Sequence, residues 1–274
     1  MAASQRQGSC VATIVELHRV GLRYGGDDEG TLALQDLNFS VQEGEFVAVV
    51  GPSGCGKSTL MKVVSGLWRA SAGAVVVRNK EVTGPLSFVG MAFQNPNLLP
   101  WRNTLRNIML PLEIVQPHAK KLRSERPAYL ERARDLLRLV GLGEFEARFP
   151  WQLSGGMKQR ATQCRELNHE QELLMLDEPF GALDMFTREE LWLALQELWL
   201  ARRPTVILVT HDLREAVFLA DRVLVMSNRP GKIIADYTVN LARPRTLDDT
   251  FRPEAISLIQ ELRDHISSVR KKAA

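Results

Sequence analysis

The sequence predicts an α/β fold, because three short apolar segments have the length and composition of strands buried on both faces of a parallel sheet. They cover residues 46–50, 173–176 and 205–210. Each segment leads directly into glycine, carboxylate or histidine residues. Because ligands of open α/β sheets bind beyond the carboxyl ends of the strands, we expect a ligand site at this edge of the sheet.

The composition is that of an ordinary globular protein. The 274 residues suffice for one or two domains with a large core, and 45% of them are apolar and 24% charged. The formal charge of +3 is too small to indicate nucleic-acid binding. The three cysteines lack paired or metal-like spacing, which favours a reducing compartment. No segment approaches the ~18 apolar residues that span a bilayer, so we expect any role at a membrane to depend on another chain.

The N-terminal region has strand character after a short polar end. Residues 1–10 are small and polar, which is typical of a disordered terminus. Residues 11–17, 20–24 and 32–41 are expected to form an antiparallel sheet beside the first buried strand. Tyr24 closes one of these strands, and its ring can stack on a nucleotide base. The alternative interpretation is a half-buried strand tyrosine.

A phosphate-binding loop follows the first buried strand. Residues 51–58 match the pattern G-x-x-x-x-G-K-[ST] and lead into a helix. Glycines let the backbone N–H groups surround a polyphosphate at the helix N-terminus, which disfavours a mere glycine-rich turn with a solvated lysine. Lys57 is expected to reach the β- and γ-phosphates, and Ser58 to ligate Mg²⁺. The expected nucleotide-binding residues here are Gly51, Pro52, Ser53, Gly54, Cys55, Gly56, Lys57, Ser58 and Thr59.

The next segment changes from strand to helical periodicity. Residues 74–77 and 86–93 are predicted strands, and Gln94 follows at once, where its amide can meet Mg²⁺ or water. Helical spacing from residue 104 to 142 predicts an all-helical insertion of about fifty residues. Free N–H groups at the start of the following helix predict a second anion site. Its residues are Ser154, Gly155, Gly156 and Met157.

Two carboxylates, Asp177 and Glu178, end the second buried strand. Adjacent strand residues point to opposite faces, so one can hold Mg²⁺ through its water shell while the other faces the water that attacks the γ-phosphate. The third buried strand delivers His211 to the same edge. The remaining predicted elements are a turn at 181–184, a helix at 187–201, strands at 223–226 and 232–237, and an amphipathic helix at 252–270.

This ordered set of motifs resembles the ATPase subunit of ABC transporters over residues 11–240. The set comprises Tyr24, the loop at 51–58, Gln94, Leu-Ser-Gly-Gly-Met at 153–157, Asp177-Glu178, Gly-Ala-Leu-Asp at 181–184 and His211. Three further features are similar to the nitrate, taurine and aliphatic sulfonate importer branch. They are Met157 at the end of the signature, residues 97–101 after Gln94, and Ala-Arg-Pro-Arg at 242–245.

The resemblance implies a RecA-like P-loop NTPase core with an antiparallel β-subdomain and an all-helical subdomain. The expected organisation is a disordered N-terminus at 1–10, the core with the β-subdomain at 11–94, the helical subdomain with the signature at 95–157, the second part of the core at 158–240, and a C-terminal helical extension at 241–274.

The resemblance also implies how ATP is used. Two copies, or a pair of related subunits, enclose each nucleotide between the phosphate loop of one and residues 154–157 of the other. Glu178 polarises the attacking water and His211 holds the γ-phosphate. The remaining implied roles are catalysis for Lys57 and Gln94, Mg²⁺ binding for Asp177, Ser58 and Gln94, and nucleotide contact for Tyr24 and Asp184.

Membrane partners are implied in the same way. The chain would work at the cytoplasmic face of the inner membrane with transmembrane permease subunits, and indirectly with a substrate-binding protein, without nucleic acid. The helical insertion and the segment after Gln94 would dock on the permeases. Two other functions stay open: an ABC ATPase of another transport class, such as lipid trafficking, and a soluble ABC module that acts on nucleic acid or ribosomes.

One stretch departs from the family pattern. Residues 165–172 are charged and polar, where the family is alanine-rich. If this helix packs as in relatives, Glu166 or Asn168 is buried, which costs a few kcal/mol unless the side chain is paired.

Overall fold

The computed structural model describes residues 12–25, 30–92, 97–168, 171–181 and 183–271. Gln94, Cys10 and the N-terminus predicted as disordered lie outside this part of the chain. Among the described residues a six-stranded sheet has the order β10-β9-β3-β8-β7-β6, parallel except for β10. Its strands are β3 (Phe46–Val50), β6 (Val89–Ala92), β7 (Leu173–Asp177), β8 (Thr205–Val209), β9 (Arg222–Met226) and β10 (Ile233–Thr238).

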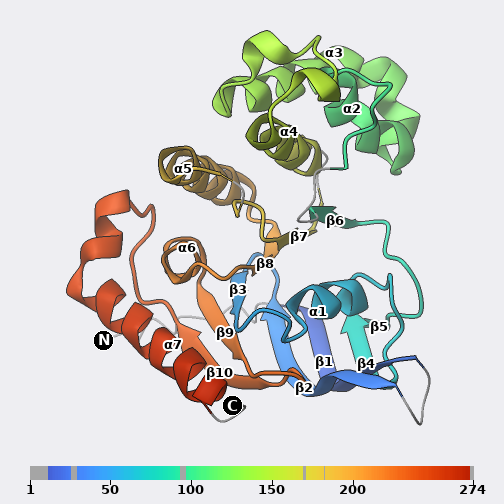
Figure 1. Ribbon diagram of the computed structural model, residues 1–274. Helices are drawn as coiled ribbons and strands as arrows, with labels where there is room; N and C mark the ends of the chain where they lie inside the picture. The colour runs from blue at the N-terminus through green and yellow to red at the C-terminus, as the bar shows by residue number, and fades with distance from the viewer. Residues whose placement is uncertain (1–11, 26–29, 93–96, 169–170, 182, 272–274) are drawn as a thin grey trace, which may run out of the picture.

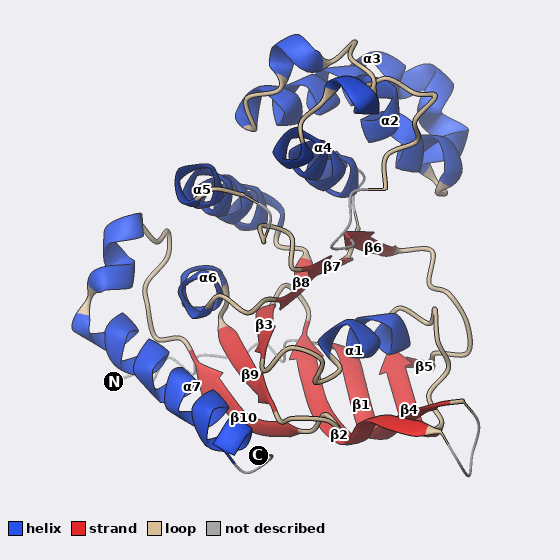
Figure 2. Ribbon diagram, in the orientation of Figure 1, coloured by secondary structure: helices blue, strands red, loops and turns tan. Residues whose placement is uncertain are grey.

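A second, antiparallel sheet has the order β2-β1-β4-β5. Its strands are β1 (Thr13–Tyr24), β2 (Thr31–Gln42), β4 (Ala72–Val77) and β5 (Lys80–Glu81). The prediction of two separate N-terminal strands is wrong, because β1 is one strand that absorbs a register shift and a positive φ of 51° at Arg19. The short helix α1 (Lys57–Val64) lies against this sheet in Figure 2.

The buried strands of the six-stranded sheet serve two cores. On β3, Phe46, Ala48 and Val50 face one core, and Val47 and Val49 face the other, as the two-residue period of a strand requires. The second core is shared with α1 and the antiparallel sheet. The uninterrupted apolar segments of the sequence therefore reflect burial on both faces.

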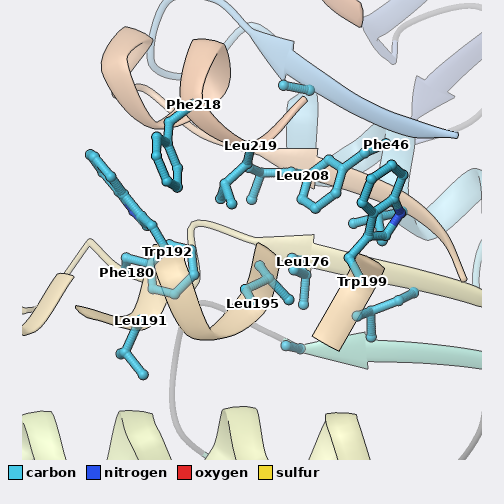
Figure 3. Close-up of a cluster of buried hydrophobic side chains, with 14 of the residues drawn as sticks. Phe46, Leu176, Phe180, Leu191, Trp192, Leu195, Trp199, Leu208, Phe218 and Leu219 are labelled. Atoms are coloured by element: carbon cyan, nitrogen blue, oxygen red, sulfur yellow. The ribbon is translucent and has the colours of Figure 1, made fainter. Parts of the chain in front are cut away.

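The first core is covered by helices α5 (Met185–Arg202), α6 (Leu213–Leu219) and α7 (Pro253–Lys271). Figure 3 shows large rings from different elements side by side: Trp199 packs on Phe46 at 5.9 Å between ring centroids, and Trp192 stacks on Phe218 at 5.7 Å. Helix α6 was not predicted, because seven residues are too few for a clear helical period. A short 3-10 helix, η3 (Leu247–Phe251), leads into α7.

A helical part lies beyond the β6 edge of the sheet in Figure 1. It contains α2 (Thr104–Ile114), α3 (His118–Leu139), the 3-10 helices η1 (Gly143–Phe145) and η2 (Pro150–Gln152), and α4 (Gly155–Asn168). The helical period predicted from 104 to 142 is broken where Val115 turns to extended backbone and Pro117 caps the next helix. The boundary predicted at residue 157 falls inside α4, which packs on α2 and α3 as one helix.

The polar end of α4 is buried and paired. Glu166 is 7% exposed, and its carboxylate accepts a hydrogen bond from Arg165 Nε at 2.9 Å. Burial raises the pKa of Glu166, and the charge of Arg165 opposes this shift. Asn168 is fully buried, donates to the carbonyl of Ile108 at 3.1 Å and accepts from Arg132 Nε at 3.2 Å. The charged departure from the family pattern is therefore accommodated by specific partners.

Candidate active site

Three parallel strands end at the same level of the sheet. Val49 on β3 and Asp177 on β7 are both in register with Val209 on β8. The residues after these strands therefore come together: the loop at 51–58, Glu178 and His211. This is the edge at which the sequence predicted a ligand site.

The loop at 51–58 wraps around its own lysine. Lys57 Nζ donates to the carbonyl oxygens of Gly51 at 2.9 Å and Pro52 at 3.1 Å, and Lys57 is only 6% exposed. Gly56 has a φ of 110°, and a Cβ there would lie 2.8 Å from Leu34 Cδ2, so glycine is required. The loop runs directly into α1, so that its N–H groups and the helix N-terminus form an anion-binding cradle.

Tyr24 lies beside the start of α1. Its hydroxyl and that of Thr59 share a hydrogen bond of 2.5 Å. The edge of its ring meets Trp68 in a T-shaped contact, with 5.2 Å between ring centroids and an angle of 85° between planes. Lys62 Nζ lies 4.1 Å from the centroid of the Trp68 ring. The predicted base-stacking residue is thus held next to the phosphate loop by a tryptophan that the sequence analysis did not single out.

Asp177 has the environment of a metal-site carboxylate. It is 5% exposed and hydrogen-bonded to Ser58, and burial raises its pKa. Its Oδ1 atom is buried without a hydrogen-bond partner. A buried carboxylate oxygen with spare capacity beside a serine hydroxyl matches the oxygen ligands and bound waters that Mg²⁺ prefers. These two residues therefore fit the predicted metal site.

Glu178 and His211 form a close pair. His211 Nδ1 lies 3.3 Å from Glu178 Oε2, and the backbone N–H of Glu178 donates to Val209 at 2.8 Å. Glu178 has a φ of 48°, a conformation that costs a non-glycine residue on the order of 1–3 kcal/mol and is common at functional sites. The pair faces the turn at 181–184, because a Cβ on Gly181 would lie 3.9 Å from both Glu178 Oε2 and His211 Cε1.

The second predicted anion site lies on the helical part. Ser154 Oγ accepts from the N–H of Met157 at 3.2 Å at the start of α4, and Gly156 approaches the side chain of Leu183. Helix α4 packs on α2, α3 and β6, whereas α1 packs on β2, β4 and β7. Within one copy the serine-glycine turn and the phosphate loop thus belong to different layers.

Asp184 serves first as a helix cap. Its carboxylate accepts from the N–H and hydroxyl of Thr187 at 3.0 and 2.7 Å, and these bonds lower its pKa. Sequence reasoning missed Arg188, one turn later in α5. It donates to Asp212 at 2.9 Å and to the carbonyl of Leu183 at 3.1 Å. Its spacing of four residues from Asp184, on a helix that starts at the site, is the signal that marks it.

No helix in the described ranges has both the length and the apolar character needed to cross a membrane.

Comparison with known proteins agrees with this geometry. Residues 34–181, more than half of the chain, match the ABC transporter family. The nitrate import ATP-binding protein NrtD of Synechococcus elongatus is 45% identical over 215 residues, 78% of this chain and 77% of its own. The taurine import ATP-binding protein TauB of Yersinia pestis is 41% identical over 215 residues, 78% of this chain and 82% of its own.

A solved structure is similar over most of the chain. The dimeric post-hydrolysis state of the ATP-binding cassette MJ0796, bound to ADP and Pi, has a TM-score of 0.71 and 28% identity, and the match covers 84% of this chain and all of that one. The chain belongs to the ABC transporter family, as an ATP-binding subunit that hydrolyses ATP.

Proposed function

We propose that this chain powers the import of a small anion of the nitrate, taurine or sulfonate type through separate membrane subunits. The observation that carries the proposal is the convergence of Lys57, Asp177 and the Glu178–His211 pair at one edge of the sheet. The importer class and the type of solute are supported by the identity to the nitrate and taurine import proteins.

The site residues divide the work of hydrolysis. Lys57 and the loop N–H groups bind the β- and γ-phosphates, and Glu178 orients the attacking water. His211, 3.3 Å from Glu178, contacts the γ-phosphate. Ser58 and Asp177 would hold Mg²⁺, which neutralises charge on the phosphate oxygens when bound. Phosphoryl transfer depends mainly on positioning and charge stabilisation, and these groups supply both. Gln94, the third predicted Mg²⁺ ligand, lies outside the described residues.

Two copies complete each site in this proposal. Residues 154–157 of one copy contact the nucleotide that the phosphate loop of the other copy holds, and Asp184 lies at the junction. The solved relative is a dimer, which supports this arrangement. Within one copy the phosphate loop and the serine-glycine turn lie in different layers, which also supports a site that two copies share.

The permease subunits would dock on a groove of the helical part. The groove has a volume of about 580 Å³ and lies between the residues before α2 and helices α2 and α3. Trp101 is 71% exposed on its rim, and Leu105, Met109 and Leu130 form part of its wall. A helix of a partner chain that carries both apolar and acidic side chains would fit a groove with apolar walls and several arginines. Docking there, with a substrate-binding protein beyond the permeases, would place the chain at the cytoplasmic face of the inner membrane.

Two variants test the ATPase site. Lys57→Ala is expected to lose ATP binding, because no other ammonium in the loop replaces Nζ. Glu178→Gln is expected to bind ATP normally, hydrolyse it at least a hundredfold more slowly, and accumulate an ATP-bound dimer in size-exclusion chromatography. Glu189→Gln, which removes a carboxylate from α5, is the control. Parental ATPase activity in Glu178→Gln would refute the proposed role of Glu178.

Co-purification tests the importer assignment. The chain is purified with its membrane partners and reconstituted in liposomes. Its ATPase rate should then rise when nitrate, taurine or an alkyl sulfonate is added together with the cognate binding protein. Stimulation by a lipid alone would favour the other transport class.

A further inference from the structure

One guanidinium group connects two of the turns that surround the site. Arg188 Nη1 donates to Asp212 Oδ2 at 2.9 Å, and Arg188 Nη2 donates to the carbonyl oxygen of Leu183 at 3.1 Å. Leu183 belongs to the turn that follows Glu178, and Asp212 directly follows His211. The two terminal nitrogens of the planar fork therefore hold residues that follow two different strands, Leu183 after β7 and Asp212 after β8.

The fold presents Arg188 to this position. Asp184 caps α5 through the N–H of Thr187, and its carbonyl accepts from the N–H of Arg188 at 3.0 Å. Side chains in a helix lean toward its N-terminus, so Arg188 extends back over the turn at 181–184. The guanidinium and its partner are each about three-quarters buried, with 24% and 23% of their side chains exposed.

Both carboxylate oxygens and the backbone N–H of Asp212 are hydrogen-bonded. Its Oδ1 atom caps α6 by accepting from the N–H groups of Arg214 at 2.9 Å and Glu215 at 3.2 Å. Its own N–H donates to Thr210 Oγ1 at 3.0 Å. Oδ2 accepts from Arg188, so the ion pair couples the start of α5 to the residue that directly follows His211.

We propose that Arg188 is a positioning residue for ATP hydrolysis, which ties Leu183 to Asp212 beyond the end of β8 and so keeps Glu178 and His211 in register. The inference rests on the proposed roles of Glu178 and His211. Among the described residues the hydrogen bonds of the Arg188 guanidinium go to Asp212 and Leu183, so its proposed effect on Glu178 and His211 is indirect. Its loss should misplace the pair and slow the chemical step, while nucleotide binding by the phosphate loop continues.

A neighbouring ion pair provides a matched control. Glu189 Oε1 and Arg214 Nη2 are 3.2 Å apart and connect α5 with α6, whereas the Arg188 pair connects α5 with the residue that caps α6. The pair is also partly buried, with 16% and 34% of the side chains exposed. The hydrogen bonds described for these two side chains join them to each other and join Arg214 to Thr250, whereas those of Arg188 go to Leu183 and Asp212. Glu189→Gln thus removes one ion pair between α5 and α6 without releasing either turn.

The experiment compares steady-state ATP hydrolysis with nucleotide binding in the full-length chain. Arg188→Gln is expected to lower kcat by roughly tenfold to a hundredfold, with KM and the Kd of a fluorescent ATP analogue changed less than about twofold. Arg188→Lys keeps the charge but cannot hold both oxygens, so its kcat should also fall. Glu189→Gln should retain kcat within about twofold. Asp212→Asn, which keeps the α6 cap, should lower kcat and add little to Arg188→Gln in the double variant.

Each rate is divided by the number of analogue-binding sites, so that a partly unfolded sample does not imitate a catalytic defect. Equal kcat in Arg188→Gln and Glu189→Gln would overturn the inference. A fall in kcat that matches a rise in Kd would also overturn it, because Arg188 would then act on binding. If Glu178→Gln hydrolyses ATP like the parent, the proposed function fails instead, and the two failures are distinguishable.

Discussion

At the scale of single residues, the buried carboxyl group of Glu215 lowers the stability of the fold when it is ionised. It lies in the first turn of α6 and is 2% exposed. Burial, and then the nearby charge of Asp212, raise its pKa to about 8. The group is therefore protonated in the folded protein at neutral pH, whereas it is ionised in the unfolded chain.

This shift predicts how stability depends on pH. Between about pH 4.5 and 8 the folded state binds one more proton than the unfolded state, so this group lowers stability as pH rises, by up to ~1.4 kcal/mol per unit. Glu215→Gln removes the effect and should be more stable than the parent at pH 8.5 by a few kcal/mol, with the difference lost near pH 4.5.

Urea unfolding at both pH values measures this difference. Glu189→Gln, on the neighbouring helix, serves as the control for a lost carboxylate. Parallel stability curves for Glu215→Gln and the parent would show that Glu215 is ionised in the folded protein.

At the scale of elements, Asn168 fastens the end of α4 to both neighbouring helices. It donates to Ile108 on α2, and it accepts from Arg132 on α3 through both its side chain and its backbone carbonyl. A hydrophobic residue at this position would leave the Ile108 carbonyl and the guanidinium with fewer partners in a buried place. The polar sequence at 165–168 is thus part of how the helical part is assembled.

Asn168→Ala is expected to lower the free energy of unfolding by about 1–3 kcal/mol, because two buried hydrogen bonds are lost and a small cavity remains. Chemical denaturation monitored by circular dichroism checks this. Ser124→Ala, which removes an exposed hydroxyl from α3, should change stability by less than about 0.5 kcal/mol. An equally small effect of Asn168→Ala would contradict this prediction, because it would mean that the Ile108 carbonyl and Arg132 form hydrogen bonds with water in the variant.

At the scale of the whole molecule, the separation of the two anion sites implies cooperation between copies. Lys57→Ala disables the phosphate loop, and Gly156→Asp places a carboxylate at the serine-glycine turn, where it repels phosphate. Each variant alone should be inactive. A mixture should recover ATPase activity, because a mixed dimer contains one site with an intact loop and an intact turn.

Titration of one inactive variant with the other, at constant total protein, measures this recovery. Activity should pass through a maximum near equal amounts. A flat, inactive titration would contradict a nucleotide site that two copies share.

Prediction from sequence succeeded where the signal is local. The segment at 46–50 is buried on both faces and is a strand of those five residues, and the loop that follows has Gly54 and Gly56 at positive φ. Helix α6 and the single long β1 were missed, because a seven-residue helix and a strand with a register shift carry no clear period. The predicted boundary at 157 falls inside α4, and the packing of this helix on α2 and α3 has no local signal in the sequence.

The strand, loop and helix around residues 46–64, and the residue types that end the next two buried strands, could be predicted from the chain alone, because backbone conformation there follows from neighbours in the chain. The contacts of Arg188 with Leu183 and Asp212, in contrast, depend on how the chain packs and could not be predicted from the sequence. Those partners lie five and 24 positions away along the chain, and side-chain contacts between separate elements depend on how the helices pack on the sheet.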